Sequence, residues 1–300
     1  MAKQRIGLIG LGKMGHGIGK NLLRKGYVLT VYDVDPAAVA RLSALGAAPA
    51  ASPKQVAEGS DIVITVLPNG PDVEHVVLGP EGVVAGARPG TIVLDCSTID
   101  PQVTRRVGAA LRAAGCGMVD AGMGGMPPAA EDGSLILMVG ATPEDLARVT
   151  PLLEAMGKQS IHCGGPGAGM SVKLINNLLA MTILAADLEA LAMGVRAGLK
   201  PEALLRVLCA TYADNKPLHT LVPEKILQGD HEPGFKAVLA HKDVGLAVDF
   251  AASLRVPIWT LGPVRQLLSL VLAQGKGEQA NTVIATAFEE IIGTRFSEWK

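Results

Sequence analysis

The sequence predicts a Rossmann-type α/β domain with a doubly wound sheet, followed by an all-helical domain, with a long helix joining the two. Short apolar runs alternate with helical segments through the first half of the chain, which is typical of a mainly parallel sheet covered by helices. The alternation stops at Cys163-Gly-Gly-Pro-Gly167, and only helical patterns follow. A long apolar stretch to Leu199 stands at this change. We therefore expect two domains, residues 1–165 and 166–300.

Composition narrows the class of protein. Hydrophobic residues make up 49% of the 300 residues and charged residues 18%, which is enough for two sizeable cores. The net charge of −1 and the lack of a basic stripe make nucleic acid an unexpected partner. The start of the chain lacks the apolar region of a signal peptide, so we expect a cytoplasmic protein. No H-x-x-x-H pair occurs, and the cysteines lack metal-ligand spacing, so we expect no metal site and reduced core thiols at Cys96, Cys116, Cys163 and Cys209.

A glycine-rich turn follows the first apolar run, Arg5 to Gly10. It reads Gly10-Leu-Gly12-Lys-Met-Gly15 and opens a helical stretch that ends near Gly26. Between a strand and a helix, the first glycine makes the tight turn, the second lets the backbone approach a pyrophosphate, and the third lets the helix pack on the strand. The pattern predicts a dinucleotide site at Gly10, Leu11, Gly12, Lys13, Met14 and Gly15.

The second apolar run, residues 27–33, ends in Asp33, which lies 23 positions after Gly10. A carboxylate at this place accepts hydrogen bonds from the adenosine ribose. The same carboxylate would repel a 2′-phosphate, so the sequence favours NAD over NADP.

Further strands and helices are expected in alternation. Apolar runs predict strands at 61–67, 91–95, 117–120 and 135–139. Proline-led segments predict helices at 36–45, 71–78, 101–114 and 143–156. In doubly wound sheets ligands bind beyond the carboxyl ends of the strands.

Three of these strand ends carry candidate site residues. They are Leu67-Pro68-Asn69, Ser97-Thr98, and the segment from Asp120 to Gly133. Capping of the following helix is an equally good explanation for Ser97 and Thr98. The segment Gly122-Met-Gly-Gly-Met-Pro-Pro128 is rich in backbone N–H groups that suit a carboxylate, although its composition equally suits a plain surface loop.

The long apolar stretch begins Gly167-Ala-Gly-Met-Ser-Val-Lys173-Leu-Ile-Asn176-Asn177. It contains no proline until Pro201, so a single long helix is predicted. Lys173 and Asn177 are four residues apart and share one helical face. Lys173, Asp187 and Glu189 interrupt the stretch, which favours a helix buried within the protein over a membrane span.

The second half reads as a series of helices. They are expected at 201–208, 223–227, 238–254, 263–273 and 281–292. The triplet His241-Lys242-Asp243 interrupts one of them, and its pattern suits either a solvated turn or a charged contact with the candidate site.

Four motifs in order resemble the β-hydroxyacid dehydrogenase family, near its 3-hydroxyisobutyrate dehydrogenases and its sulfolactaldehyde and tartronate semialdehyde reductase branch. They are the turn Gly7–Gly15, Asp120-Ala-Gly-Met-Gly-Gly125, Gly167-x-Gly-x-x-x-Lys173-x-x-Asn176-Asn177, and Lys242-Asp243. The resemblance covers essentially the whole chain, and the lysine motif is its most specific part.

The resemblance implies a nicotinamide-dependent oxidoreductase that interconverts a short 3-hydroxy acid and its aldehyde or keto acid. Lys173 would be the general acid/base, since burial and a positive oxidised nicotinamide favour the neutral amine. Asn177 would position the substrate. The resemblance further implies substrate contacts at Gly122, Met123, Gly124, Gly125 and Phe235, and cofactor contacts at Leu67, Pro68, Thr98 and Lys242.

The substrate segment departs from the family pattern Asp-Ala-Pro-Val-Ser-Gly-Gly. Gly122 replaces the proline, Gly124 the serine and Met126 the last glycine. The sulfolactaldehyde reductase branch places an arginine where Gly125 stands, so the departure favours a carboxylate substrate over a sulfonate.

Two other functions fit parts of the sequence. An imine reductase is one, although such relatives generally place another residue where Lys173 stands. A non-catalytic dinucleotide-binding module is the other, and the intact Lys173 and Asn177 speak against it. The apolar helical half has only one long helix to cover it, so we expect a homodimer or homotetramer.

Overall fold

The computed structural model describes residues 4–232 and 234–299, so the outermost ends of the two predicted domains lie outside the described residues. The chain forms two compact units that divide after Lys173. The predicted boundary at residue 165 lies eight residues earlier, because the start of the long helix packs against the sheet of the first unit.

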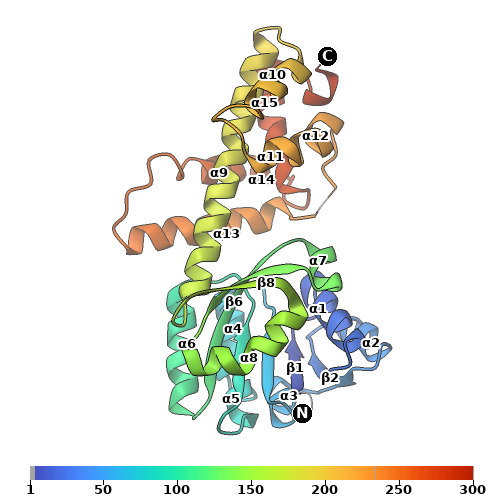
Figure 1. Ribbon diagram of the computed structural model, residues 1–300, viewed down its shortest axis with the longest axis vertical. Coiled ribbons are helices and arrows are strands. Elements are labelled where there is room, and N and C mark those ends of the chain that lie inside the picture. The colour runs from blue at the N-terminus through green and yellow to red at the C-terminus, as the bar shows by residue number, and fades with distance from the viewer. Residues whose placement is uncertain (1–3, 233, 300) are drawn as a thin grey trace. The chain divides into compact units, whose positions relative to one another are not determined.

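The first unit is built on one eight-stranded sheet with the strand order β3-β2-β1-β4-β5-β6-β7-β8 (Figure 1). All strand pairs are parallel except β6 with β7, which confirms the predicted mainly parallel sheet. The strands are β1 (Arg5–Ile9), β2 (Val28–Tyr32), β3 (Ala48–Pro49), β4 (Ile62–Thr65), β5 (Ile92–Asp95), β6 (Gly117–Gly124), β7 (Leu135–Gly140) and β8 (Gly157–Gly164).

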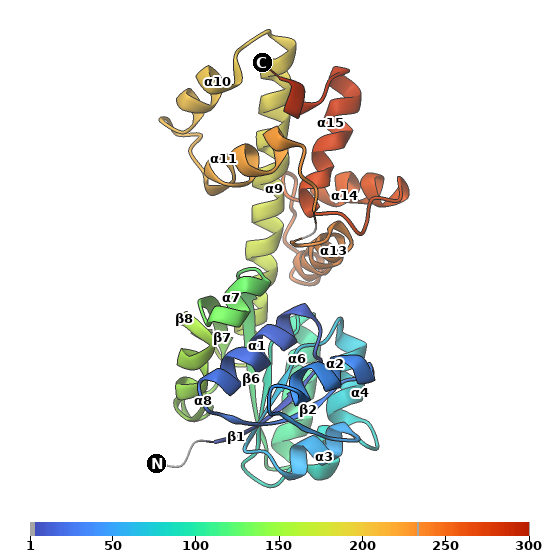
Figure 2. The same cartoon turned by 90° about the vertical axis from the view of Figure 1, so that its right-hand side faces the viewer.

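Helices cover both faces of this sheet (Figure 2). One core lies under α1 (Lys13–Arg24), α2 (Pro36–Ser43), α7 (Pro127–Asp132) and α8 (Pro143–Met156). The other lies under α3 (Pro53–Glu58), α4 (Gly70–Leu78), α5 (Val83–Gly86) and α6 (Pro101–Ala113). Alternate residues of one strand feed the two cores: Leu8 points to the first and Ile9 to the second. The sheet is therefore buried on both sides, as parallel sheets are.

The expected elements of this unit are present, and the structure adds several that the sequence pattern did not predict. The strand β8 is mostly polar and exposed, so it lacks the apolar signature of the central strands. The helix α7 begins Pro127-Pro128, which reads as a loop. The predicted loop from Asp120 to Gly133 is therefore wrong in part, because β6 continues to Gly124 and α7 follows.

The helix α9 (Ala168–Arg196) begins in the first unit and continues in the second, as the predicted long helix does. By length and hydropathy it could cross a membrane, but half of its most apolar window is buried inside the protein. Leu174, Leu184 and Leu188 on this helix belong to the core of the second unit. This is the pattern of a core helix.

The described part of the second unit contains helices and no strand longer than a single bridge. The remaining helices are α10 (Pro201–Leu208), α11 (Lys216–His219), α12 (Leu221–Glu224), η1 (Ile226–Gln228), α13 (Ala237–Ser253), α14 (Val264–Ala273), η2 (Asn281–Ile284), α15 (Ala285–Ile292) and η3 (Phe296–Glu298). The predicted helices at 223–227 and 281–292 are wrong in detail, because each region is divided between a helix and a 3-10 turn. The all-helical second domain is confirmed.

Candidate active site

The glycine-rich turn joins β1 to α1, and two of its glycines cannot carry a side chain. Gly10 has φ +89°, and a Cβ on it would lie 2.2 Å from the carbonyl oxygen of Val66. A Cβ on Gly15 would lie 1.9 Å from the carbonyl oxygen of Gly10. A Cβ on Gly12, by contrast, would meet no atom within 4 Å. The turn is thus tightly packed on the protein side and open at Gly12, where a ligand can approach.

The remaining residues of the turn provide backbone N–H groups, rather than side chains, for a ligand. Gly12 caps α1 without any side-chain hydrogen bond, so the first N–H groups of the helix, including those of Lys13 and Met14, point out of its start. The side chain of Leu11 is buried in the core. An open helix start behind a close-approach glycine fits the pyrophosphate of a dinucleotide.

Asp33 follows β2 and lies against this turn. Its Oδ2 accepts a hydrogen bond of 2.6 Å from the N–H of Leu11, and its Oδ1 accepts one of 2.8 Å from the N–H of Asp35. The two bonds fix the carboxylate beside the glycine-rich turn. A carboxylate has about four acceptor positions, so Asp33 keeps capacity for ribose hydroxyls.

The loops after β4 and β5 are tied together by hydrogen bonds. The N–H of Leu67 donates to Ser97 Oγ at 2.8 Å, and the N–H of Ser97 donates to Asp95 Oδ1 at 3.0 Å. Helix α6 is capped by Asp100, whose carboxylate accepts from the N–H of Gln102. Capping is therefore the wrong explanation for Ser97 and Thr98. Ser97 instead holds the loop that carries Leu67 and Pro68.

These loops follow neighbouring parallel strands and so lie at one edge of the sheet. The order β2-β1-β4-β5-β6 places the ends of β1 and β4 side by side, although the chain travels outward in opposite directions from them. Such a reversal of strand order opens the crevice in which doubly wound folds bind ligands. The glycine-rich turn, Asp33, and the loops with Leu67, Pro68 and Thr98 all border this edge.

Asp120, in β6, anchors the start of α9, a role that the sequence did not reveal. Its Oδ1 accepts from the N–H of Gly167 at 2.6 Å and its Oδ2 from the N–H of Met170 at 2.7 Å. The side chain is fully buried. Burial raises the pKa of Asp120 to about 6, against the two N–H groups, which lower it. An acidic residue within an otherwise apolar strand was the available signal.

The first turn of α9 lies directly on the sheet because of Gly167 and Gly169. Gly167 has φ +87°. A Cβ on Gly169 would come within 2.3 Å of the carbonyl oxygen of Met138. With the Asp120 bonds, this close approach sets the rotation of α9 and so the direction of the residues that follow.

Lys173 lies one turn further along α9, at the carboxyl end of β6. Its Nζ donates to the carbonyl oxygen of Met123 at 2.7 Å, and the side chain is partly buried. A Cβ on Gly122 would lie 2.6 Å from the Cβ of Lys173. Gly122 therefore lets the lysine stem rest on the strand. Gly124 and Gly125 follow at the same edge, so the predicted substrate segment and Lys173 are brought together within the first unit.

The second unit holds its own group of polar residues. The amide of Asn177 donates to Asp243 Oδ2 at 2.8 Å, and Lys242 Nζ lies 3.1 Å from Asp243 Oδ1. Asp243 is 97% buried. The triplet 241–243 lies within α13, so of its two alternatives the solvated turn is wrong. Phe235 packs at the margin of the second core.

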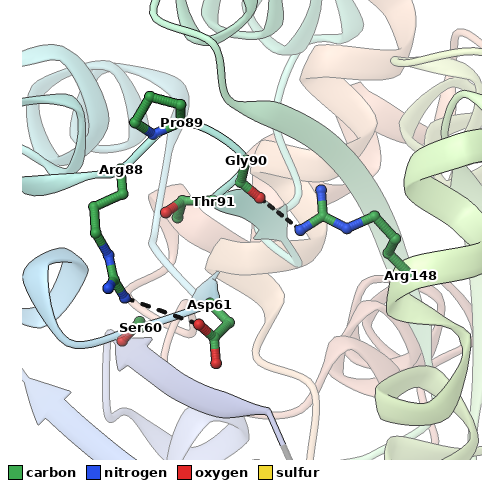
Figure 3. A pocket seen from close by; sticks show the side chains of 7 residues that line it. All are labelled: Ser60, Asp61, Arg88, Pro89, Gly90, Thr91 and Arg148. Atoms are coloured by element: carbon green, nitrogen blue, oxygen red, sulfur yellow. Dashed lines mark hydrogen bonds and ion pairs between the residues drawn. The ribbon is translucent and has the colours of Figure 1, made fainter.

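A separate hollow of about 280 Å³ lies at the opposite edge of the sheet (Figure 3). Asp61 and Thr91 on its wall precede β4 and β5, so it borders the amino ends of the strands. Its charged side chains are engaged by other residues of the chain: Arg88 lies 3.9 Å from Asp61, and Arg148 donates to the carbonyl oxygen of Gly90. Its position and these contacts separate it from the candidate active site.

Two family models match the chain. The NAD binding domain of 6-phosphogluconate dehydrogenase matches residues 5–165. The NAD-binding region of NADP-dependent 3-hydroxyisobutyrate dehydrogenase matches residues 167–288. Together they span both units. The chain belongs to the β-hydroxyacid dehydrogenase family.

Individual members of the family resemble the chain over most of its length. It is 40% identical to the 3-sulfolactaldehyde reductase of Escherichia coli over 91% of this chain and 92% of that protein. It is 37% identical to the NAD-dependent L-serine dehydrogenase of Pseudomonas aeruginosa over 97% and 99%. Among solved structures, the Mycobacterium tuberculosis 3-hydroxyisobutyrate dehydrogenase with L-serine matches with a TM-score of 0.89 and 30% identity, covering 95% of this chain and 99% of that one.

These findings confirm the family and fold predicted from the motifs. The protein is an oxidoreductase of the 3-hydroxyacid dehydrogenase type with an NAD(P)-binding domain, and its substrate is a small molecule.

Proposed function

We propose that the protein is an NAD-dependent dehydrogenase that interconverts a short 3-hydroxy carboxylate and its aldehyde or keto acid, with Lys173 as general acid/base. One observation carries this proposal. The Lys173 amine lies at the same carboxyl edge of the sheet as the glycine-rich turn and Asp33. A proton-transferring group and a dinucleotide cradle thus share one edge.

Different residues of the chain have different roles in the proposed reaction. The glycine-rich turn and Asp33 would hold the dinucleotide, whose nicotinamide would accept or supply the hydride. Lys173 takes the proton from the substrate hydroxyl as hydride leaves the carbon, and returns it in the reverse direction. The hydrogen bond to the Met123 carbonyl holds the amine until substrate is bound. Asn177, one turn along α9, positions the substrate hydroxyl, and the buried carboxylate of Asp243 orients its amide.

A carboxylate is the substrate group that best fits the segment from Gly122 to Met126. It contains three glycines and two methionines, so it offers backbone N–H groups and no cationic side chain. Although the E. coli relative is named for a sulfonate, this segment supplies no arginine for one. Lys242 and Phe235 stay predictions, as contacts of cofactor and substrate respectively.

NAD is proposed over NADP because two carboxylates stand near the place of the adenosine ribose. Asp33 is fixed at the turn, and Asp35 caps α2 two residues later. The residue between them is Val34, whose uncharged side chain cannot pair with a 2′-phosphate. The name of the P. aeruginosa relative supports the same cofactor.

The test is an NAD reduction screen over short 3-hydroxy acids, with 3-hydroxyisobutyrate, 3-hydroxypropionate, L-serine and a sulfonate analogue, and NADH oxidation with the matching aldehydes. Lys173→Ala is expected to lower kcat by about 10²–10⁴-fold while NADH binding is retained. Lys173→Arg keeps the charge and removes the proton transfer, so it should be similarly inactive. A Lys173→Ala variant within twofold of wild type would refute the role of the lysine.

Coenzyme choice has its own test. The ratio of kcat/KM for NADH to that for NADPH should favour NADH, and Asp33→Asn should reduce the preference. Asparagine keeps an acceptor for the N–H of Leu11, so the turn should survive the change. Equal use of both coenzymes by the wild type would contradict the choice of NAD.

An exposed apolar surface on α9 favours self-association of the chain. Ile175 is 56% exposed, Leu179 47% and Met193 73%, an apolar surface along α9 that suits a second copy of the chain. We propose a homodimer or homotetramer in the cytoplasm. Light scattering after size exclusion tests the assembly, and a monomer at micromolar concentration would contradict it.

A further inference from the structure

A cysteine, an aspartate and a histidine come together on the second unit, away from the residues proposed for catalysis. Cys209 follows α10, Asp214 lies in the turn before α11, and His219 is the last residue of α11. One potential ligand atom from each lies within 4.8 Å of the others. Asn177 and Asp187 on α9 are ten residues apart, about 15 Å along the helix, so this group, which lies beside Asp187, is separate from the Asn177 group.

We propose that Cys209, Asp214 and His219 bind a divalent transition metal of the Zn²⁺ type. Thiolate, imidazole and carboxylate are the three side-chain ligands that zinc prefers. With metal–ligand bonds of about 2.0–2.3 Å, tetrahedral ligands stand about 3.3–3.7 Å apart. The three potential ligand atoms lie within 4.8 Å of one another. Shifts of about an ångström in these side chains would bring them to the tetrahedral spacing.

A buried carboxylate beside the three ligands supports a cation. Asp187 is 93% buried, and its Oδ2 has no hydrogen-bond partner among the described residues. It lines a mostly apolar hollow of about 400 Å³ that also borders Leu208 and Leu218, the neighbours of two of the ligands. A dication would compensate the buried carboxylate of Asp187.

The same carboxylate stiffens the turn that carries the ligands. The amide of Asn215 donates to Asp187 Oδ1 at 2.9 Å and to the carbonyl oxygen of Ala213 at 3.0 Å. Its own Oδ1 accepts from the N–H of Leu218 at the start of α11. Asn215 thus joins α9, the turn of Asp214 and the helix of His219. Residues that orient ligands in this way are typical of metal sites.

Metal binding would change the contacts of all three side chains. His219 Nε2 and Asp214 Oδ1 lie 2.5 Å apart, within hydrogen-bond distance. Metal binding to the neutral imidazole replaces this contact with two metal–ligand bonds, leaves the ring hydrogen on Nδ1, and displaces the thiol proton of Cys209 into solvent. The metal then closes the segment between α10 and α11. Three ligands at intervals of five residues give a C-x4-D-x4-H spacing, which is not a familiar zinc pattern, so the sequence did not predict the site.

The experiment is isothermal titration of Zn²⁺ into the chelator-stripped full-length protein in two buffers of different ionisation enthalpy. We expect one equivalent bound per chain and about one proton released. Cys209→Ser and His219→Ala should each weaken binding by more than about tenfold, since even outer partners of a ligand contribute about that much. Cys163→Ser is the matched control, because Cys163 is also partly exposed. It should bind as the wild type does.

Cobalt provides an independent readout of the thiolate. Co²⁺ should give a thiolate-to-metal charge-transfer band that Cys209→Ser lacks. Zn²⁺ should also raise the unfolding temperature of the wild type and leave that of Cys209→Ser unchanged, while turnover is unaffected in both. Absence of saturable Zn²⁺ binding, or binding that Cys209→Ser and His219→Ala leave unchanged, would overturn the proposal and leave only a hydrogen bond between His219 and Asp214 at the surface.

Discussion

The carboxyl edge of the sheet and the Asn177–Asp243–Lys242 group hold their polar atoms in different ways. At the sheet edge, the open groups belong to the backbone of the glycine-rich turn, and the side chains of Asp33 and Ser97 hold the neighbouring loops by hydrogen bonds. In the second unit the polar group consists of side chains only, with residues 66 positions apart joined by one hydrogen bond.

The two regions therefore differ in the substitutions that they tolerate. A backbone site depends on missing side chains, so a single added methyl group can destroy it. A side-chain group depends on complementary charges, so the removal of one charge weakens it without changing the fold.

Gly15→Ala is expected to destabilise the protein by about 3 kcal/mol or more, since its Cβ would lie 1.9 Å from the Gly10 carbonyl oxygen. Gly12→Ala is the matched change, with open space around its Cβ. It should fold normally and bind NADH weakly. Urea denaturation and NADH fluorescence titration measure the two effects. Wild-type NADH affinity in Gly12→Ala would contradict the placement of the cofactor.

Asp120 should make stability depend on pH. Its folded pKa of about 6 exceeds its ordinary value of 3.8, so between these values the folded state binds more protons than the unfolded one. Its contribution is therefore present below about pH 4 and lost as pH rises through 6, a change of about 3 kcal/mol. Urea denaturation at pH 4 and pH 7 compares wild type with Asp120→Asn, which lacks the titration. Equal pH dependence in both would show that the carboxyl group does not titrate in this range.

Gly122→Ala should displace the stem of Lys173, because its Cβ would lie 2.6 Å from that of the lysine. Crowding of this kind costs about 1–3 kcal/mol, which we expect mainly as reduced kcat. Gly59→Ala is the control, since no atom lies within 4 Å of its added Cβ and its φ is −96°. Steady-state kinetics and NADH binding should separate the pair. Equal kcat in both variants would show that Gly122 does not set the lysine position.

Asp243→Asn should have the smallest effect. The change removes the charge that orients the Asn177 amide and pairs with Lys242, so kcat/KM for the hydroxy acid should fall by about tenfold, near 1.4 kcal/mol. Stability should change little, because asparagine keeps the shape and one acceptor. Thermal unfolding is the control. A variant with wild-type kcat/KM would indicate that the group only packs the second unit.

The glycine-rich turn shows why much of the fold was readable from the sequence. Gly10, Gly12 and Gly15 act within six consecutive residues, and their effect depends on local backbone geometry. Six of the eight strands and most helices were likewise predicted because apolar periodicity is a local signal. The strand β8 escaped prediction because its exposed edge carries polar residues.

Asp120, Asp243 and the Cys209–Asp214–His219 cluster show what the sequence left open. Asp120 caps a helix that starts 48 residues later, and Asp243 orients an amide 66 positions earlier. Hydrogen bonds between such distant residues produce no periodic pattern in the sequence, since each partner could equally bond to other residues. The sequence by itself determined the two-part architecture and the dinucleotide turn, because these follow from local geometry and burial, and its resemblance to the family identified the lysine motif. Only the tertiary structure decided which buried acid orients which group, because that depends on contacts between distant segments.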